Sequence, residues 1–163
     1  NRVRTFYSDS LLIEQEVCEA DVVIGAVLLP GAAAPKLVTR DMIKKMKPGS
    51  VVVDVAIDQG GCFETSKPTT HADPTFMVDG VLHYCVANMP GAVARTSTFA
   101  LTNATYPFVE AIANRGFMKA VSIDHHLRNG LSVHKGVLTS KPVAQAQGLD
   151  FESAEGLLMA ENL

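Results

Sequence analysis

The 163-residue sequence contains no tryptophan, few aromatic residues (6%) and only three cysteines, Cys18, Cys62 and Cys85. The cysteines are unevenly spaced and include no Cys-x-x-Cys pair, so the sequence shows no disulfide framework. An odd number of unpaired cysteines is typical of proteins from a reducing compartment. We therefore expect reduced thiols and a cytoplasmic location.

The sequence also lacks an excess of basic charge and any long apolar run. Its formal net charge is −3 and its pI is near 5.9, so no basic surface is expected to meet a nucleic acid. No stretch approaches the roughly 20 apolar residues of a membrane helix, and we expect neither a signal peptide nor a membrane partner. The hydrophobic content of 47% and mean hydropathy of +0.17 predict a globular protein with a sizeable core.

Several motifs with known chemistry are absent. The sequence has no G-x-G-x-x-G turn, no P-loop and no nucleophile elbow. The histidines do not form a metal-binding pattern either, since His125 and His126 are adjacent, His134 is isolated, and His71 lies near Asp73 in a turn-rich segment. A zinc site is therefore not expected.

The most informative stretch is Val-Val-Val-Asp-Val-Ala-Ile-Asp-Gln-Gly-Gly-Cys at residues 51–62. An apolar, β-branched run that ends in a polar residue and two glycines predicts a buried parallel strand that carries Asp58 to the sheet edge. Ligands of open α/β sheets bind outside the carboxyl ends of the strands. Asp54 would lie on the same face of this strand, where a buried carboxylate is expected to anchor a neighbouring loop.

The rest of the chain alternates strand and helix patterns. Strands are predicted at residues 2–7, 22–29 and 82–87. Helices are predicted after residues 8–10, at 40–46, at 96–114 with a break or kink at Pro107, and from Ser153. A small hairpin is predicted at residues 131–136. We predict an α/β fold, namely the second half of a Rossmann-type parallel sheet with helices, followed by a long helix and a tail. The predicted boundary separates residues 1–95 from residues 96–163.

Asn88 follows the strand pattern at residues 82–87 much as Asp58 follows the central strand. If both strands are parallel in one sheet, a carboxylate and an amide converge at one edge, and Gly60 and Gly61 permit a backbone nest for an anion. The alternative is structural, because Asp58 can cap the next turn and Asn88 can form an Asx turn.

Three other positions are weaker candidates. The apolar strand end at Val27 and Leu28 can form the wall of an adenosine or nicotinamide site. Ser8 lies at a strand-to-helix junction, where its hydroxyl can bind a ribose or adenine, or cap the helix. Lys67 can bind a phosphate as a point charge, although a single loop lysine is more often only solvated.

Long segments of the sequence resemble NAD-dependent alanine dehydrogenases, within the alanine dehydrogenase and pyridine nucleotide transhydrogenase family. They are Val-Leu-Leu-Pro-Gly at residues 27–31, Ala-Pro-Lys-Leu-Val at 34–38, Lys-Pro-Gly-Ser at 47–50, Val-Ala-Ile-Asp-Gln-Gly-Gly-Cys at 55–62, Pro-Thr-Thr at 68–70, Tyr-Cys-Val-Ala-Asn-Met-Pro-Gly at 84–91 and Thr-Ser-Thr-Phe-Ala-Leu-Thr-Asn-Ala-Thr at 96–105. The α component of proton-translocating transhydrogenase is similar at the Pro-Gly and Ala-Pro-Lys-Leu segments but does not resemble the Ala-Ile-Asp-Gln-Gly-Gly-Cys run.

The resemblance implies reversible oxidative deamination of L-alanine to pyruvate and ammonia with NAD as cofactor, and the alternative is an NAD(H)-binding module without chemistry of its own. It places the catalytic aspartate of the family at Asp58, and it makes Asn88 a candidate to bind the substrate or the nicotinamide amide. The implied NAD contacts are Ser8, Val27, Leu28, Val55, Ala56, Ile57, Asp58, Lys67, Val86, Ala87, Asn88 and Met89. A carboxylate suits this chemistry because it can orient water and stabilise positive charge at nitrogen.

The resemblance also implies what lies outside this sequence. The substrate-binding Arg and Lys of the family, its catalytic His, its glycine-rich turn and its ribose-binding acidic residue belong to an N-terminal half, so we expect this chain alone to be inactive. Residues 1–95 correspond to the C-terminal portion of the NAD-binding domain. Residues 96–163 correspond to the connecting helix and the C-terminal segment of the substrate domain. The family implies a homohexamer.

Overall fold

The computed structural model of the protein describes residues 3–161, and contacts within the chain divide it into two units. Unit 1 contains the described residues up to Leu29 together with Ala33–Ala92, and unit 2 contains Pro30–Ala32 and the residues from Val93 onward. This division falls close to the boundary expected at residues 95 and 96. The assignment of the two parts to an NAD-binding and a substrate domain stays a prediction.

Unit 1 is built on a four-stranded sheet with strand order β1-β2-β4-β3, where β1 is Val22–Gly25, β2 is Val51–Asp54, β3 is Thr75–Val78 and β4 is Val81–Tyr84. Strands β1, β2 and β4 are parallel, and β3 is an antiparallel edge strand paired with β4. Asp79 and Gly80 join β3 to β4 with φ values of 50° and 82°. Two successive positive φ angles form the tight turn that matches the twist of a hairpin, and Asp-Gly suits them. The α/β fold with a mostly parallel sheet confirms the predicted fold class.

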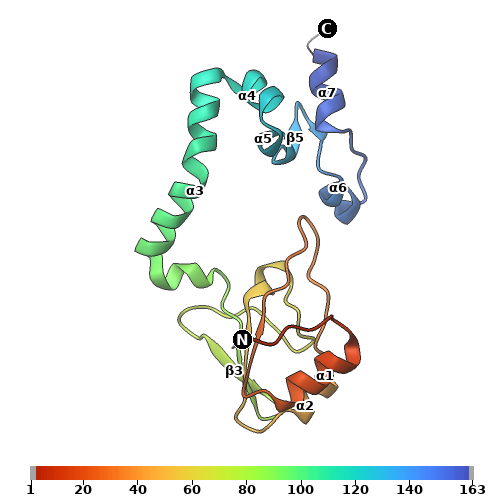
Figure 1. Ribbon diagram of the computed structural model, residues 1–163, viewed down its shortest axis with the longest axis vertical. Helices are drawn as coiled ribbons and strands as arrows, with labels where there is room; N and C mark the ends of the chain where they lie inside the picture. The colour runs from red at the N-terminus through yellow and green to blue at the C-terminus, as the bar shows by residue number, and fades with distance from the viewer. Residues whose placement is uncertain (1–2, 162–163) are drawn as a thin grey trace. The chain divides into compact units, whose positions relative to one another are not determined.

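Two helices of unit 1 begin at side-chain caps. Helix α1 (Ser10–Glu19) is capped by Asp9, and α2 (Arg40–Lys45) is capped by Thr39, whose side-chain oxygens accept hydrogen bonds from the backbone N–H groups of Leu12 and Met42. Figure 1 shows α1 and α2 side by side. Their apolar residues bury themselves with β2 and the segments after it, in a core that contains Val17, Ala34, Val38, Met42, Ile43, Met46, Val52, Ala56, Cys62, Phe63 and Val81.

The first helix of unit 2 is the 22-residue α3 (Ala94–Arg115), and α4 (Phe117–Ile123) and α5 (His125–Asn129) follow it. A two-stranded hairpin of β5 (Val133–His134) and β6 (Val137–Leu138) follows, and then α6 (Lys141–Gln147) and α7 (Ala154–Glu161). The predicted hairpin and terminal helix are confirmed. Within the described residues, no helix has the length and apolar character that a membrane crossing requires.

The predicted central strand was too long. Strand β2 ends at Asp54, and the next residues form a 3₁₀ helix, η1 (Val55–Gln59), so Asp54 and Asp58 do not share one face of a strand. Gly60 and Gly61 then adopt positive φ angles of 92° and 76°, which turn the chain back toward the strand end. There the Asp54 carboxylate binds the returning backbone, as described below.

Three other strand predictions also differ from the structure. The strand predicted at residues 2–7 is not formed over residues 3–7, where the backbone is irregular, and Arg2 lies outside the described residues. A strand needs a neighbour to satisfy its backbone groups, and the β1 edge of the sheet has no further strand paired to it among the described residues. Strand β1 ends at Gly25 rather than at residue 29, and β4 spans residues 81–84 rather than 82–87.

Candidate functional site

A cavity of about 430 Å³ lies beyond the carboxyl ends of β1 and β2 in unit 1. The two strands are parallel, with Gly25 paired to Asp54, so the segments that leave them begin at the same edge of the sheet. The residues that line the cavity come from these two segments and are Ala26, Val27, Leu28, Val55, Ala56, Asp58 and Gln59. Five of the predicted site residues are therefore brought together: Val27, Leu28, Val55, Ala56 and Asp58.

Asp58 supplies the carboxylate of this cavity. Its side chain is exposed on η1, and no donor among the described residues bonds to it. The structural alternative, in which Asp58 caps the next turn, thus finds no supporting hydrogen bond within residues 3–161. The walls beside it are mainly aliphatic, and among residues 3–161 the carboxylate is the one charged group that lines the cavity.

Gln59 connects the two segments that form the cavity. Its Nε2 donates to the Leu29 carbonyl at 3.3 Å, and the Leu29 N–H donates to its Oε1 at 3.4 Å. A second cross-link joins the same loops, because the Ala34 N–H donates to the Gln59 carbonyl at 2.9 Å. Sequence reasoning did not single out Gln59, although its position directly after Asp58 placed it in the same motif.

Asn88 does not line this cavity. It has a φ of 56°, and its carbonyl accepts hydrogen bonds from the Gly91 N–H at 2.9 Å and from the His71 imidazole, with 3.0 Å between Nε2 and the oxygen. Asparagine tolerates this left-handed conformation better than most residues. Asn88 therefore forms a turn through its backbone carbonyl, and no described residue is hydrogen-bonded to its side chain as an Asx turn requires. The role of its side chain stays a prediction.

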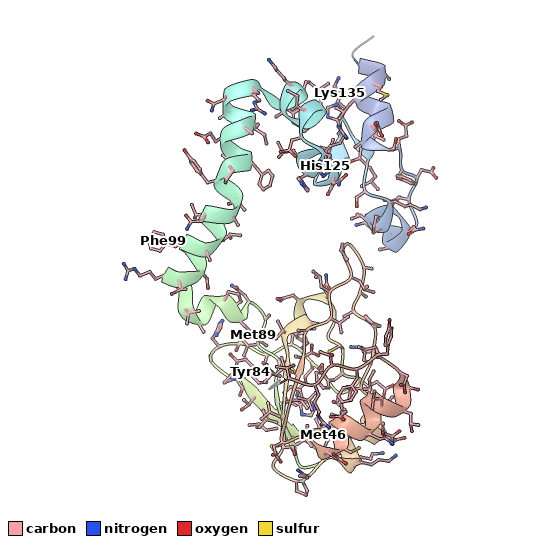
Figure 2. All side chains as sticks on the ribbon, in the orientation of Figure 1. Met46, Tyr84, Met89, Phe99, His125 and Lys135 are labelled. Carbon is pink, nitrogen blue, oxygen red and sulfur yellow. The ribbon has the colours of Figure 1, made fainter. Side chains whose placement is uncertain are left out.

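The other residues of the second strand end differ in exposure. Val86 is fully buried and pairs with Thr69 in an isolated parallel bridge, and the Ala87 N–H donates to the Thr69 carbonyl at 3.1 Å. Met89, labelled in Figure 2, begins the 3₁₀ helix η2 (Met89–Val93). Val86 exposes none of its surface, and its contact with NAD stays a prediction.

Ser8, Lys67 and Ile57 also lie away from the cavity lining. Ser8 is exposed just before α1, and the helix is capped by Asp9, so the capping alternative does not apply to Ser8. The Lys67 ammonium lies 4.6 Å from the centroid of the Phe76 ring, a cation–π contact. Ile57 is buried beneath η1.

Asp54 forms a buried polar network next to this cavity, as the sequence predicted for a structural carboxylate. It is fully buried and accepts hydrogen bonds from the Cys62 N–H at 2.9 Å, the Phe63 N–H at 3.4 Å and the Ser66 hydroxyl. The Cys62 thiol lies 3.7 Å from the other carboxylate oxygen. Burial, together with the nearby Asp54 charge, raises the pKa of the Cys62 thiol to about 11.

His83 is a second buried titratable group of unit 1. Its Nδ1 donates to the Val81 carbonyl at 3.0 Å, so its Nε2 accepts from the Thr65 hydroxyl at 2.7 Å. Burial lowers the pKa of His83 from its usual value, which favours the neutral ring. This histidine is satisfied within the core. Among the described residues, no three His, Cys, Asp or Glu side chains are grouped so as to bind a metal ion.

A mostly parallel sheet with a cavity outside the carboxyl ends of its strands is the arrangement of nucleotide-binding α/β domains. Comparison with known families makes this assignment specific. Residues 1–141 match the family described as "Alanine dehydrogenase/PNT, C-terminal domain". The chain belongs to this family.

Individual relatives agree with the family match. The chain is 65% identical to an alanine dehydrogenase of Halomonas elongata and 57% identical to one of Mycolicibacterium smegmatis, over 96% of this chain and 42% of each relative. A solved L-alanine dehydrogenase superposes on 87% of this chain, and 39% of its own, with a TM-score of 0.74 and 51% identity. A transhydrogenase from Sinorhizobium meliloti superposes on 66% of this chain with a TM-score of 0.59 and 32% identity. The matched part is 30% of the transhydrogenase chain. The chain thus spans about two-fifths of the length of the curated relatives it matches.

Proposed function

We propose that the chain forms part of an NAD-dependent L-alanine dehydrogenase, which reversibly converts L-alanine to pyruvate and ammonia. The observation that carries this proposal is the Asp58 carboxylate in an otherwise aliphatic cavity of about 430 Å³, at the edge of a parallel sheet. The relatives named alanine dehydrogenase support the reaction, since the first of them is 65% identical over nearly the whole chain.

The lining of the cavity fits a nicotinamide ring. Its volume lies within the range of small-molecule sites, roughly 300–1,000 Å³, and aliphatic side chains on two sides can exclude water from a planar ring. Val27, Leu28, Val55 and Ala56 would hold the ring. When bound there, NAD would supply the acceptor for the hydride that leaves the α-carbon of alanine. We place the remaining contacts of NAD at the exposed Ser8, at Lys67, at Ile57, and at Val86, Ala87, Asn88 and Met89.

Asp58 is the residue we assign to the chemistry. Its carboxylate can accept a hydrogen bond from the ammonium group of alanine or from the water that replaces ammonia. Its negative charge stabilises the positive charge that develops at nitrogen. Asn88 is proposed to bind the substrate carbonyl or the nicotinamide amide through its side chain.

The whole-protein properties are proposals at the same level. The substrate is a small amino acid or oxo acid, the location is the cytoplasm, and the assembly is a homohexamer. Since the chain spans about two-fifths of its relatives' length, we expect the 163-residue chain alone to reduce no NAD with L-alanine.

Replacing Asp58 with Asn in the full-length protein tests the assignment. The amide preserves the size of the side chain but removes its charge, so we expect kcat for alanine deamination to fall about 100-fold or more. NADH binding, followed by fluorescence titration, should change little. Asp73→Asn is the matched control, because Asp73 is an exposed carboxylate of the same unit in a loop. Unchanged turnover in D58N would remove Asp58 from the mechanism.

A second candidate is an NAD(H)-binding module without its own chemistry. It is favoured by the similarity in fold to the Sinorhizobium meliloti transhydrogenase, at a TM-score of 0.59 and 32% identity. Such a module would bind NADH but would show no alanine-dependent turnover in the full-length protein before any substitution is made. The same titration and activity measurements therefore distinguish the two candidates.

A further inference from the structure

Two opposite charges hold the turn that follows Asp58. The turn comprises residues 60–63. Its backbone N–H groups donate to the Asp54 carboxylate, and its carbonyl groups accept from the Lys36 ammonium. We call these two side chains and the turn the charge clamp: the Asp54 carboxylate, the Lys36 ammonium and residues 60–63. Neither Lys36 nor Asp54 lines the cavity.

The carboxylate side of the clamp is buried. Asp54 Oδ2 accepts from the Cys62 N–H at 2.9 Å and from the Phe63 N–H at 3.4 Å. The approach is so close that a Cβ on Gly61 would lie 2.5 Å from this oxygen, and the φ of 76° at Gly61 also favours glycine. The glycine is therefore required for the carboxylate to reach the turn.

The ammonium side of the clamp comes from the loop after β1. Lys36 Nζ donates to the Gly60 carbonyl, to the Gly61 carbonyl at 2.8 Å and to the Phe63 carbonyl at 3.3 Å. A lysine has three N–H donors, and these three carbonyls use all of them. Lys36 therefore has no donor left for a ligand, and its role lies in the turn itself.

The turn is continuous with the helix that carries Asp58. Gly60 ends η1, and its N–H donates to the Ile57 carbonyl at 2.9 Å, while the Gly61 N–H donates to the Ala56 carbonyl at 2.9 Å. Ala56 and Ile57 precede Asp58 in this short helix, and Gly60 and Gly61 follow the end of the helix. A shift of the turn therefore shifts the Asp58 backbone and the direction of its carboxylate.

We propose that Lys36 and Asp54 are positioning residues that fix the Asp58 carboxylate through the turn at residues 60–63. This inference rests on the proposed function of Asp58. Lys36 binds the carbonyl groups and Asp54 the N–H groups of one turn, so η1 is held from both sides. An active-site group that moves by about 1 Å can lose about 100-fold in rate, so the clamp has a measurable kinetic role.

The test compares Lys36→Met with Lys44→Met in the full-length protein. Methionine keeps an unbranched side chain and removes the three donors. Lys44 is the matched control because its ammonium is exposed and, within the described part of the chain, pairs only with Asp41, three residues away on α2. We expect K36M to lower kcat about 10-fold or more and to leave the Kd for NADH within about twofold, and K44M to change neither.

Three further measurements make the outcome decisive. K36M should keep the cooperative unfolding transition of the wild type, because Lys36 lies at the surface and water can replace its ammonium at the turn carbonyls. Asp54→Asn should show the same split between kcat and NADH affinity, and if this buried variant does not fold, K36M decides. A K36M enzyme with wild-type kcat, or one that loses turnover and NADH affinity equally, would overturn the clamp. D58N separates the two proposals, since full activity in D58N removes the proposed function itself.

Discussion

The two units of the chain differ in how they bury apolar side chains. Unit 1 encloses Phe63, Ile43 and Val52 completely, and even its buried carboxylate and imidazole have hydrogen-bond partners. In unit 2, none of the 22 residues of α3 is buried. Among the described residues of unit 2, those that are buried all follow α3 in the chain and are Ala120, Val121, Thr139, Ala144 and Leu158.

An apolar sequence pattern therefore indicates different environments in the two units. In unit 1 the pattern marks residues that pack against each other within the same unit. In α3 it marks side chains that stay exposed, among them Phe99, which is 60% exposed and projects from the helix in Figure 2, and Leu101, Tyr106, Val109 and Ile112. An apolar helix face is stabilised by packing rather than by intrinsic propensity, so the two units are expected to respond differently to mutation.

The largest expected contrast is between two phenylalanines. Phe63→Ala should lower the free energy of unfolding of the chain by about 3–5 kcal/mol, because a fully buried ring is lost and a cavity remains. Phe99→Ala removes the same atoms from an exposed site and should change the free energy of unfolding by about 0.5 kcal/mol or less. Urea denaturation followed by circular dichroism measures both. Equal losses would show that α3 is as well packed as the sheet unit.

A smaller contrast is expected between two glycines. A Cβ at Gly25 would lie 2.2 Å from Cys62 Sγ and 2.6 Å from the Phe63 ring, so Gly25→Ala should cost about 1–3 kcal/mol through overpacking. Gly130 of unit 2 has an αR backbone, and its nearest contact would be an ordinary 3.4 Å, so Gly130→Ala should be nearly neutral. Thermal denaturation of both variants checks the comparison, and a stable G25A would show that β1 and the Cys62 segment can separate.

The smallest expected effect is a pH dependence of unit 1. The pKa of Cys62 is about 11 in the folded protein, above the value of 9.0 for a free thiol, because burial disfavours the thiolate. As the pH rises, the Cys62 thiol therefore loses its proton in the unfolded state before it does so in the folded state. The free energy of unfolding is unaffected below about pH 9 and decreases as the pH rises toward 11. Between about pH 8.5 and pH 10 the ionisation of Cys62 should lower the free energy of unfolding by about 1 kcal/mol.

Substitution of Cys62 by Ala should remove this part of the alkaline destabilisation. Cys18→Ala is the control, because Cys18 is only partly buried. The difference in unfolding free energy between each variant and the wild type is measured at both pH values. If the C62A difference does not change with pH, burial of Cys62 does not contribute to the pH dependence.

Much of the fold could be predicted from the sequence because it depends on local patterns. Asp9 and Thr39 cap their helices as their residue types favour, and Gly136 gives the hairpin turn a positive φ of 84°. The fold class followed from alternating strand and helix patterns. The predicted strand ends were wrong because an apolar run such as Val55–Ile57 continues the sequence pattern of a strand. In the structure, backbone hydrogen bonding ends β2 at Asp54.

Part of the candidate site could also be predicted, because it too depends on local sequence patterns. The strand edge and Asp58 were named from the sequence, and the structure brings Asp58 together with Val27, Leu28, Val55 and Ala56. Gln59 and Lys36 were not singled out, since their contacts join residues that are 24–30 positions apart in the chain. A polar side chain in a loop gives no sign in the sequence of which distant backbone group it binds.

The sequence by itself determined the class of fold, the burial of Asp54, and the segments that identify the family. The tertiary structure decided where the central strand stops and which residues surround Asp58. It also showed that Asp54 and Lys36 hold opposite sides of the turn at residues 60–63. The physical reason is that periodicity and capping act over a few neighbouring residues, whereas a buried carboxylate takes its partners from whatever backbone the fold brings to it.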